Sequence, residues 1–179
     1  MQLIRKEILV NGKSTDYDNI HYAAIRALSE EFQGCRYLEI GTAYGHSAFQ
    51  AWTALKPKKI TLVDTFIEER QLPFILRTLI VLGCTAEVEV LKGDSHDILP
   101  KIKDKFNVGL VDGDHTGKGS LRDLNDAWNL LEINGALIFD DIIMDKLREV
   151  SREFKLKNDI YEYKEYFDWK KGVAIMRKH

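Results

Sequence analysis

The sequence predicts an α/β fold in which a doubly wound, mostly parallel sheet of seven strands is covered by helices on both faces. Two observations support this prediction. Short apolar runs alternate with amphipathic stretches through most of the chain, and the last two apolar runs follow each other with no helix between them. The 179 residues suit one domain, in which residues 1–33 form an N-terminal extension and helix and residues 34–179 form the core.

The expected elements are delimited by apolar spacing and by glycine and proline at the segment ends. A helix over Tyr17–Phe32 comes first. The alternating strands and helices that follow are expected at Tyr37–Ile40, Ser47–Leu55, Ile60–Val63, Pro73–Leu82, Ala86–Leu91, a short helix from Ser95 toward Lys101, Phe106–Val111, Leu121–Leu131 and Gly135–Phe139.

A charged helix near Lys146–Lys155 is expected to lead into the last two strands, Ile160–Tyr166 and Val173–Met176. Because their connection is short and polar, an antiparallel hairpin is favoured over a crossover. The expected result is an otherwise parallel sheet with an antiparallel C-terminal edge.

The composition limits the classes of partner. A formal net charge of −2 gives no basic excess for nucleic acid or for an anionic membrane surface. No run approaches the roughly 18 uncharged apolar residues that a membrane helix needs, and the first residues do not read as a signal peptide. Cys35 and Cys84 have no metal-type spacing and suggest no disulfide. We therefore expect a cytoplasmic protein with a small-molecule partner.

A glycine turn follows the first expected strand. Gly41 and Gly45 bracket it, and glycine permits a tight turn and a close approach of the backbone to a ligand. Asp64 closes the second strand at about the spacing where a carboxylate grips ribose hydroxyls. The loop spells neither a dinucleotide fingerprint nor a triphosphate loop, and a plain strand–turn–helix is the alternative interpretation.

Several segments resemble a known family. Leu38–Ala48 resembles the first motif of class I methyltransferases of the catechol O-methyltransferase-like branch, and Val111–His115 resembles bacterial small-molecule methyltransferases of family 24. The likeness continues in chain order through Ile60–Asp64, Lys92–Pro100 and Gly135–Asp141. It implies a Rossmann-like core that binds S-adenosylmethionine.

The resemblance also assigns cofactor contacts. Glu39, Gly41 and Tyr44 would line the methionine end, and Asp64 would take the ribose hydroxyls. The adenine would lie among Asp94, Ser95 and His96, for which a helix N-cap is the alternative role. The full expected set is Glu39, Gly41, Thr42, Tyr44, Gly45, Ser47, Asp64, Asp94, Ser95, His96 and Asp112.

Three aspartates follow neighbouring strands: Asp112 after the fourth, and Asp140 and Asp141 after the fifth. Carboxylates brought this close repel unless one holds a proton or a cation lies among them, and magnesium prefers oxygen ligands. The set resembles the metal triad of catechol O-methyltransferase, with Asp141 where asparagine would stand. Alternatively, the aspartates only begin the next helix.

His115 lies three residues beyond Asp112, where the catechol enzymes carry a catalytic lysine. We expect His115 and Asp112 to be the catalytic residues, with Lys118 as a second candidate for the base and a simple loop hydrogen bond as the alternative role of His115.

The expected function is methyl transfer from S-adenosylmethionine to a hydroxyl of a small molecule, assisted by Mg²⁺ or another divalent cation. The alternatives are a metal-independent methyltransferase for another acceptor, or a non-catalytic module that binds S-adenosylmethionine or a nucleotide. We expect the acceptor site to be built from the N-terminal helix and the loops after the fourth and fifth strands, with a homodimer as one way to complete it.

Overall fold

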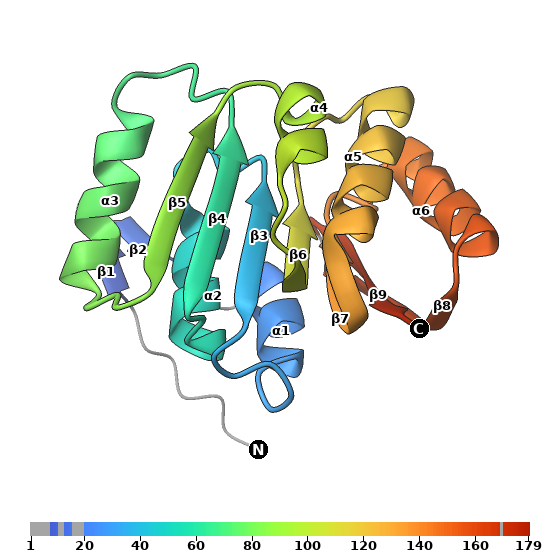
Figure 1. Cartoon of the computed structure of the whole chain (residues 1–179), viewed down its shortest axis with the longest axis horizontal. Coiled ribbons are helices and arrows are strands. Elements are labelled where there is room, and N and C mark those ends of the chain that lie inside the picture. The colour runs from blue at the N-terminus through green and yellow to red at the C-terminus, as the bar shows by residue number, and fades with distance from the viewer. Residues whose placement is uncertain (1–7, 11–12, 16–19, 169) are drawn as a thin grey trace.

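The computed structural model describes residues 8–10, 13–15, 20–168 and 170–179. Its main sheet has seven strands in the order β5-β4-β3-β6-β7-β9-β8 (Figure 1). Their bounds are β3 Arg36–Ile40, β4 Lys59–Asp64, β5 Glu87–Lys92, β6 Phe106–Val111, β7 Leu131–Phe139, β8 Ile160–Phe167 and β9 Gly172–Lys178. The predicted fold class is confirmed.

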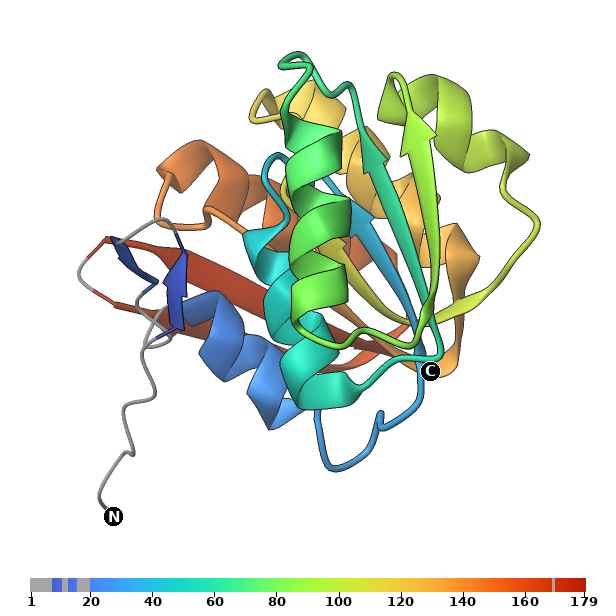
Figure 2. The same cartoon turned by 90° about the vertical axis from the view of Figure 1, so that its left-hand side faces the viewer.

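Helices cover both faces of the sheet (Figures 1 and 2). One face carries α1 Ile20–Ala27, α2 His46–Leu55 and α3 Gln71–Val81, and the other carries α4 Ser95–Ile98, the 3₁₀ turn η1 Leu99–Lys101, α5 Gly117–Leu130 and α6 Asp145–Lys157. Each layer has its own apolar core. Alternating strand residues divide between them: Leu62 packs with the α1–α3 layer and Val63 with the α5–α6 layer.

The order of the strands positions a binding crevice. The chain starts at the central strand β3, winds outward through β4 to β5, and then crosses back to β6. Ligands of such sheets bind beyond the carboxyl ends of the strands, at the point where the winding reverses. Here that point lies between the ends of β3 and β6.

The C-terminal hairpin is antiparallel, as predicted, and β9 is the strand that opposes the other six. It inserts between β7 and β8, so the outer edge is formed by β8, which runs in the same direction as the parallel strands. The turn between β8 and β9 consequently opens at the same edge of the sheet as the carboxyl ends of β3 and β6.

The end of α1 and the start of β7 are among the boundaries that differ from the prediction. Helix α1 ends at Ala27 instead of Phe32, because the chain turns through residues 28–34 to enter β3, and Gly34 donates its N–H to the Leu55 carbonyl. The expected first residues of that helix, 17–19, lie outside the described residues. Strand β7 starts at Leu131, but regular pairing with β6 resumes only at Ala136, after a register shift.

A small antiparallel hairpin of β1 Ile8–Val10 and β2 Lys13–Thr15 was not predicted. The two cysteines are free thiols, as expected.

Candidate active site

The loop after β3 requires a glycine at its first position. Gly41 has φ +83°, and its N–H donates to the Val63 carbonyl at 2.9 Å. A Cβ atom at this position would lie 1.9 Å from the carbonyl oxygen of Asp112. The ends of β3, β4 and β6 are therefore in close backbone contact, which only a residue without a Cβ atom allows at this position.

Asp64 ties two loops together at the end of β4. Its Oδ2 accepts the Ala43 N–H at 2.7 Å from the β3–α2 loop, and its Oδ1 accepts the Phe66 N–H at 2.7 Å from the β4–α3 loop. The Thr65 hydroxyl also donates to Oδ1, at 3.4 Å. A carboxylate offers about four acceptor positions, so these three hydrogen bonds still leave capacity for a ligand. Asp64 thus fits the predicted ribose contact while holding the loops in place.

A cavity of about 410 Å³ lies at this edge of the sheet. It is lined by six of the predicted cofactor residues, Gly41, Asp64, Asp94, Ser95, His96 and Asp112. Its lining also includes Ile67, Gln71 and Asp114, which the sequence did not single out. The volume is within the range of small-molecule sites.

A buried carboxylate, that of Asp123, holds two residues that line the cavity, Ser95 and Asp114. Asp94 caps α4 by accepting the His96 N–H at 2.8 Å, so it has the capping role and also lines the cavity. The Ser95 hydroxyl donates to Asp123 Oδ1 at 2.7 Å, and Asp123 also accepts the Asp114 N–H. Asp123 is fully buried, and burial raises its pKa. It lies mid-helix in α5, and no sequence pattern predicted its role.

Glu39 is a fully buried carboxylate beneath the glycine loop. The Tyr37 hydroxyl donates to its Oε2 at 2.7 Å, whereas Oε1 has no hydrogen-bond partner among the described residues. Burial raises the pKa of Glu39 to about 7, although hydrogen bonds from Tyr37 and Ser47 lower it. A buried carboxylate oxygen without a hydrogen-bond partner suits a cationic ligand group such as an ammonium, which would donate to it and stabilise its charge.

The remaining predicted loop residues have other surroundings. The Tyr44 hydroxyl donates to Glu68 at 2.6 Å and accepts from Arg70 at 3.0 Å, so it points to the β4–α3 loop. Gly45 has φ +78°, and a Cβ there would lie 2.9 Å from a side-chain carbon of Ile75. Thr42 is buried. These contacts show packing, and the predicted cofactor roles stay predictions.

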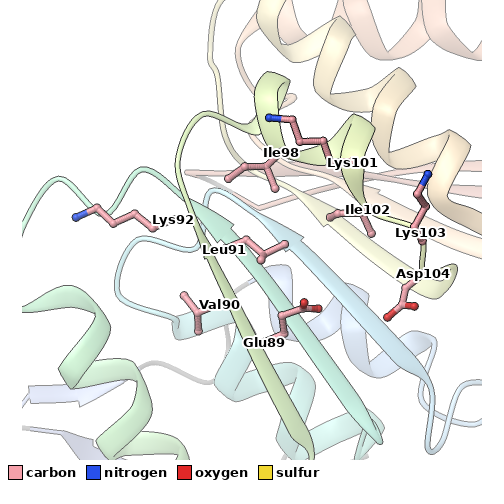
Figure 3. A pocket seen from close by; sticks show the side chains of 9 residues that line it. All are labelled: Glu89, Val90, Leu91, Lys92, Ile98, Lys101, Ile102, Lys103 and Asp104. Atoms are coloured by element: carbon pink, nitrogen blue, oxygen red, sulfur yellow. The ribbon is translucent and has the colours of Figure 1, made fainter.

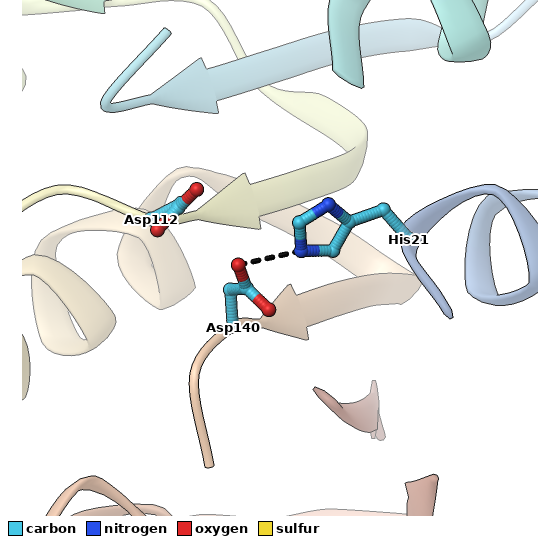
Figure 4. A group of neighbouring side chains, drawn as sticks. All are labelled: His21, Asp112 and Asp140. Atoms are coloured by element: carbon cyan, nitrogen blue, oxygen red, sulfur yellow. Dashed lines mark ion pairs between the residues drawn. The ribbon is translucent and has the colours of Figure 1, made fainter. Parts of the chain in front are cut away.

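The aspartates at the strand ends form a cluster with two histidines. Figure 4 shows one part of it, in which His21 lies beside Asp112 and Asp140. Asp140 is 1% exposed, and its Oδ2 lies 2.5 Å from Nε2 of His21, which α1 supplies. Its Oδ1 has no hydrogen-bond partner among the described residues. Although burial raises the pKa of Asp140, the hydrogen bond and charge of His21, with Lys171, hold it below its ordinary value.

His115 bridges the other two aspartates. Its Nε2 lies 2.9 Å from Asp141 Oδ2 and 3.4 Å from Asp112 Oδ1. The hydrogen bond with Asp112 and the two negative charges raise the pKa of His115 to about 9, against the opposing effect of burial. Burial raises the pKa of Asp112. In this arrangement the His115 imidazole is positively charged at neutral pH. It can take a proton from a substrate only after it has released one of its own.

The predicted triad is divided between two overlapping groups that share Asp112. In one, the ligand atoms of His21, Asp112 and Asp140 lie within 4.8 Å of one another, and in the other those of Asp112, His115 and Asp141 do. Lys171, in the turn between β8 and β9, also contacts the cluster. The sequence predicted the aspartates and His115 but missed His21 as their partner and did not single out Lys171. Lys118 is an exposed residue in the first turn of α5.

A larger hollow, of about 530 Å³, lies elsewhere, beside the edge strand β5 and η1 (Figure 3). Its lining includes Val90, Leu91, Ile98 and Ile102 with lysines at the rim. None of the predicted site residues lines this hollow. The larger of the two cavities is therefore not the one that contains the predicted site.

Residues 38–142, well over half of the chain, match the model of methyltransferase family 24, described as a methyltransferase domain. Curated proteins give no match. Among solved structures, an rRNA methylase from Streptococcus thermophilus is similar with a TM-score of 0.70 and 14% identity, covering 87% of this chain and 94% of that one.

The O-methyltransferase TomG of Streptomyces achromogenes, involved in tomaymycin synthesis and solved with S-adenosylmethionine, has a TM-score of 0.71 and 18% identity, covering 88% of this chain and 79% of that one. An S-adenosylmethionine-dependent O-methyltransferase from Thermotoga maritima has a TM-score of 0.71 and 11% identity, with coverages of 97% and 67%. At these identities the structures show a shared fold. Among the described helices, none is long and apolar enough to cross a membrane.

Proposed function

We propose that this chain, which belongs to the class I S-adenosylmethionine-dependent methyltransferases of family 24, transfers the methyl group to a hydroxyl of a small molecule. One observation supports the choice of acceptor atom most directly. Asp112 lines the cofactor cavity and also belongs to both aspartate–histidine groups. The groups suited to handling a proton therefore lie beside the position from which a methyl group would be delivered.

The chain's residues fit the cofactor. Bound S-adenosylmethionine supplies an electrophilic methyl group on a sulfonium sulfur. The unpartnered Glu39 Oε1 suits the ammonium at its methionine end, and the free lone pairs of Asp64 suit the ribose hydroxyls. Asp94, Ser95 and His96 form the wall where the adenine would lie.

The donor set also fits a divalent cation. Asp112, Asp140 and Asp141 offer carboxylate oxygens at one sheet edge, and the buried Oδ1 of Asp140 lacks a partner. Magnesium bound there would lower the pKa of an acceptor hydroxyl and orient it. The chain's own contribution is to hold the carboxylates, with His21 fixing Asp140 from α1.

His115 is the proposed proton acceptor, in the neutral form of its ring, which it reaches only after releasing the proton that Asp112 and Asp141 stabilise. Asp112 and Asp141 hold its ring at the mouth of the site, and its side chain is 46% exposed, so an acceptor can reach it. Asp112 is proposed to act with it by orienting the imidazole. The acceptor itself is proposed to be a hydroxylated small molecule such as a phenol or a sugar, and the homodimer and the cytoplasmic location stay predictions.

Calorimetry with S-adenosylmethionine and with NAD tests the cofactor, and failure to bind the former would reject the proposal. A panel of catechols, glycosides and short RNA is then screened for released S-adenosylhomocysteine. We expect turnover with a hydroxylated small molecule that is abolished by EDTA. Methylation of RNA alone would contradict the proposed acceptor.

His115→Ala and Lys118→Ala compare the two candidate bases directly. We expect His115→Ala to lower kcat by ~100-fold or more, as general-base loss does, and Lys118→Ala to retain activity. The opposite pattern would transfer the role to Lys118, and unchanged activity in both would remove both.

A further inference from the structure

We propose that Lys171 is a built-in counter-ion that competes with a divalent cation for Asp140 and Asp141, and so sets how tightly the site binds metal. The inference rests on the proposed function, because it concerns the same aspartates. It goes further in assigning a role to a residue of the C-terminal hairpin.

Lys171 contacts both adjacent aspartates. Its Nζ lies 3.4 Å from Asp140 Oδ2 and 3.9 Å from Asp141 Oδ1. An ammonium at these distances partly neutralises the same two carboxylates that a cation would bind, and the two positive charges would repel if both were present. Binding of a divalent ion to this pair therefore requires the ammonium to move away.

The other bases of the cluster are placed differently. His21 is 7% exposed and pairs with Asp140 from the side of α1, within the packed helix layer. His115 pairs with Asp141 and Asp112. Of the described basic residues in ion pairs with the cluster, Lys171 alone bridges Asp140 and Asp141, and its side chain is 40% exposed. The Lys171 ammonium therefore contacts both aspartates and can also swing out into solvent.

Asp140 gives independent evidence that a ligand belongs here. The residue is 1% exposed, yet its Oδ1 has no hydrogen-bond partner among the described residues. A buried carboxylate oxygen without a partner is costly, so an additional cation or hydrogen-bond donor would stabilise it. Lys171 and His21 both contact Oδ2, which leaves Oδ1 as the available oxygen.

The backbone of Lys171 is fixed even though its side chain is partly exposed. Its N–H donates to Asp168 Oδ1 at 2.7 Å, and its carbonyl accepts the Asp168 N–H at 3.0 Å. The next residue, Gly172, accepts the Ile142 N–H at 2.9 Å, which joins this turn to the loop that carries Asp140 and Asp141. The ammonium is thereby held within reach of the aspartates by contacts that do not involve it.

The test measures metal binding, not turnover. The full chain, saturated with S-adenosylhomocysteine, is titrated with Mn²⁺ and followed by calorimetry and by the loss of the free-ion EPR signal. Wild type is compared with Lys171→Met, Lys171→Arg and Lys164→Met; Lys164 lies on β8 and pairs with Glu162, away from the cluster. Circular dichroism melts confirm that each variant is folded.

We expect Lys171→Met to bind Mn²⁺ at least about tenfold more tightly than wild type, because one competing charge is gone. Lys171→Arg, which keeps the charge, and Lys164→Met should stay within about twofold of wild type. Equal affinity in wild type and Lys171→Met, weaker binding in Lys171→Met, or no binding in either would overturn the inference. If Lys171→Met does not fold, a Lys171→Arg variant that binds Mn²⁺ tenfold more tightly would overturn it as well. Methyl transfer is measured separately, so a failure of the proposed function can be distinguished from a failure of this inference about metal affinity.

Discussion

Replacing Gly41 by alanine tests whether the contact between β3 and β6 shapes the site. The residue has φ +83°, and an added Cβ would lie 1.9 Å from the Asp112 carbonyl oxygen and 2.4 Å from its carbon. Both are backbone atoms, so no side-chain rotation relieves the clash. The backbone of Asp112 must shift, and its carboxylate moves with it.

Two costs add in this variant. A side chain in the left-handed region costs ~1–2 kcal/mol, and forcing extra volume into a packed site costs a further ~1–3 kcal/mol. We expect Gly41→Ala to lose ~2–5 kcal/mol of unfolding free energy. Gly34→Ala is the matched control, because Gly34 has φ +68° but nothing within 4 Å of its Cβ position, so it should lose only the first cost.

Urea unfolding followed by circular dichroism measures both variants, and calorimetry measures their affinity for S-adenosylmethionine. We expect Gly41→Ala to be the less stable and to bind at least about tenfold more weakly, whereas Gly34→Ala binds as wild type. If the two variants lose the same stability, the contact with Asp112 carries no energy and the reasoning is refuted.

Three further outcomes are expected. Burial raises the pKa of Glu39 from 4.5 to about 7, so wild type should lose up to ~3 kcal/mol of stability relative to Glu39→Gln as the pH rises from about 4.5 to 7. Urea unfolding free energies of the two proteins that change in parallel over this pH range would contradict the prediction. In Asp64→Asn the side chain keeps one oxygen and loses its charge, so it cannot accept both loop N–H groups as the carboxylate does. This variant should lose ~1 kcal/mol of stability and bind S-adenosylmethionine more weakly. An unchanged affinity in calorimetry would contradict the prediction. Hydrogen bonds from Arg152 lower the pKa of Glu165 to about 2. Wild type should therefore be more stable than Glu165→Gln at pH 7, and this difference in unfolding free energy should disappear as the pH falls from about 4.5 to 2. A difference that persists in thermal melts at acid pH would count against the ion pair.

The sequence predicted the parts of the site that follow from strand order. Gly41, Asp64, Asp112 and Asp140 each come directly after a recognisable buried run, and the carboxyl ends of parallel strands meet at one edge. The β1–β2 hairpin was missed although Asn11 and Gly12, a common hairpin dipeptide, stand between its strands.

Other contacts depend on tertiary packing. His21 meets Asp140 across 119 positions of sequence, and Asp123 meets Ser95 from the middle of a helix. No local pattern marks either pairing, because it is the docking of α1 and α5 onto the sheet that creates it. The length of α1 was overestimated for a related reason: the return of the chain into β3, not helix propensity, ends it.

The single antiparallel strand has a consequence for engineering. Since β9 inserts between β7 and β8, a short turn brings Lys171 to the sheet edge that carries Asp140, while the strands that line the proposed cofactor cavity belong to a separate part of the chain. The turn can therefore be exchanged as a cassette. A library confined to residues 168–171 would vary the charge presented to Asp140 and Asp141 without altering the strands that line the proposed cofactor cavity.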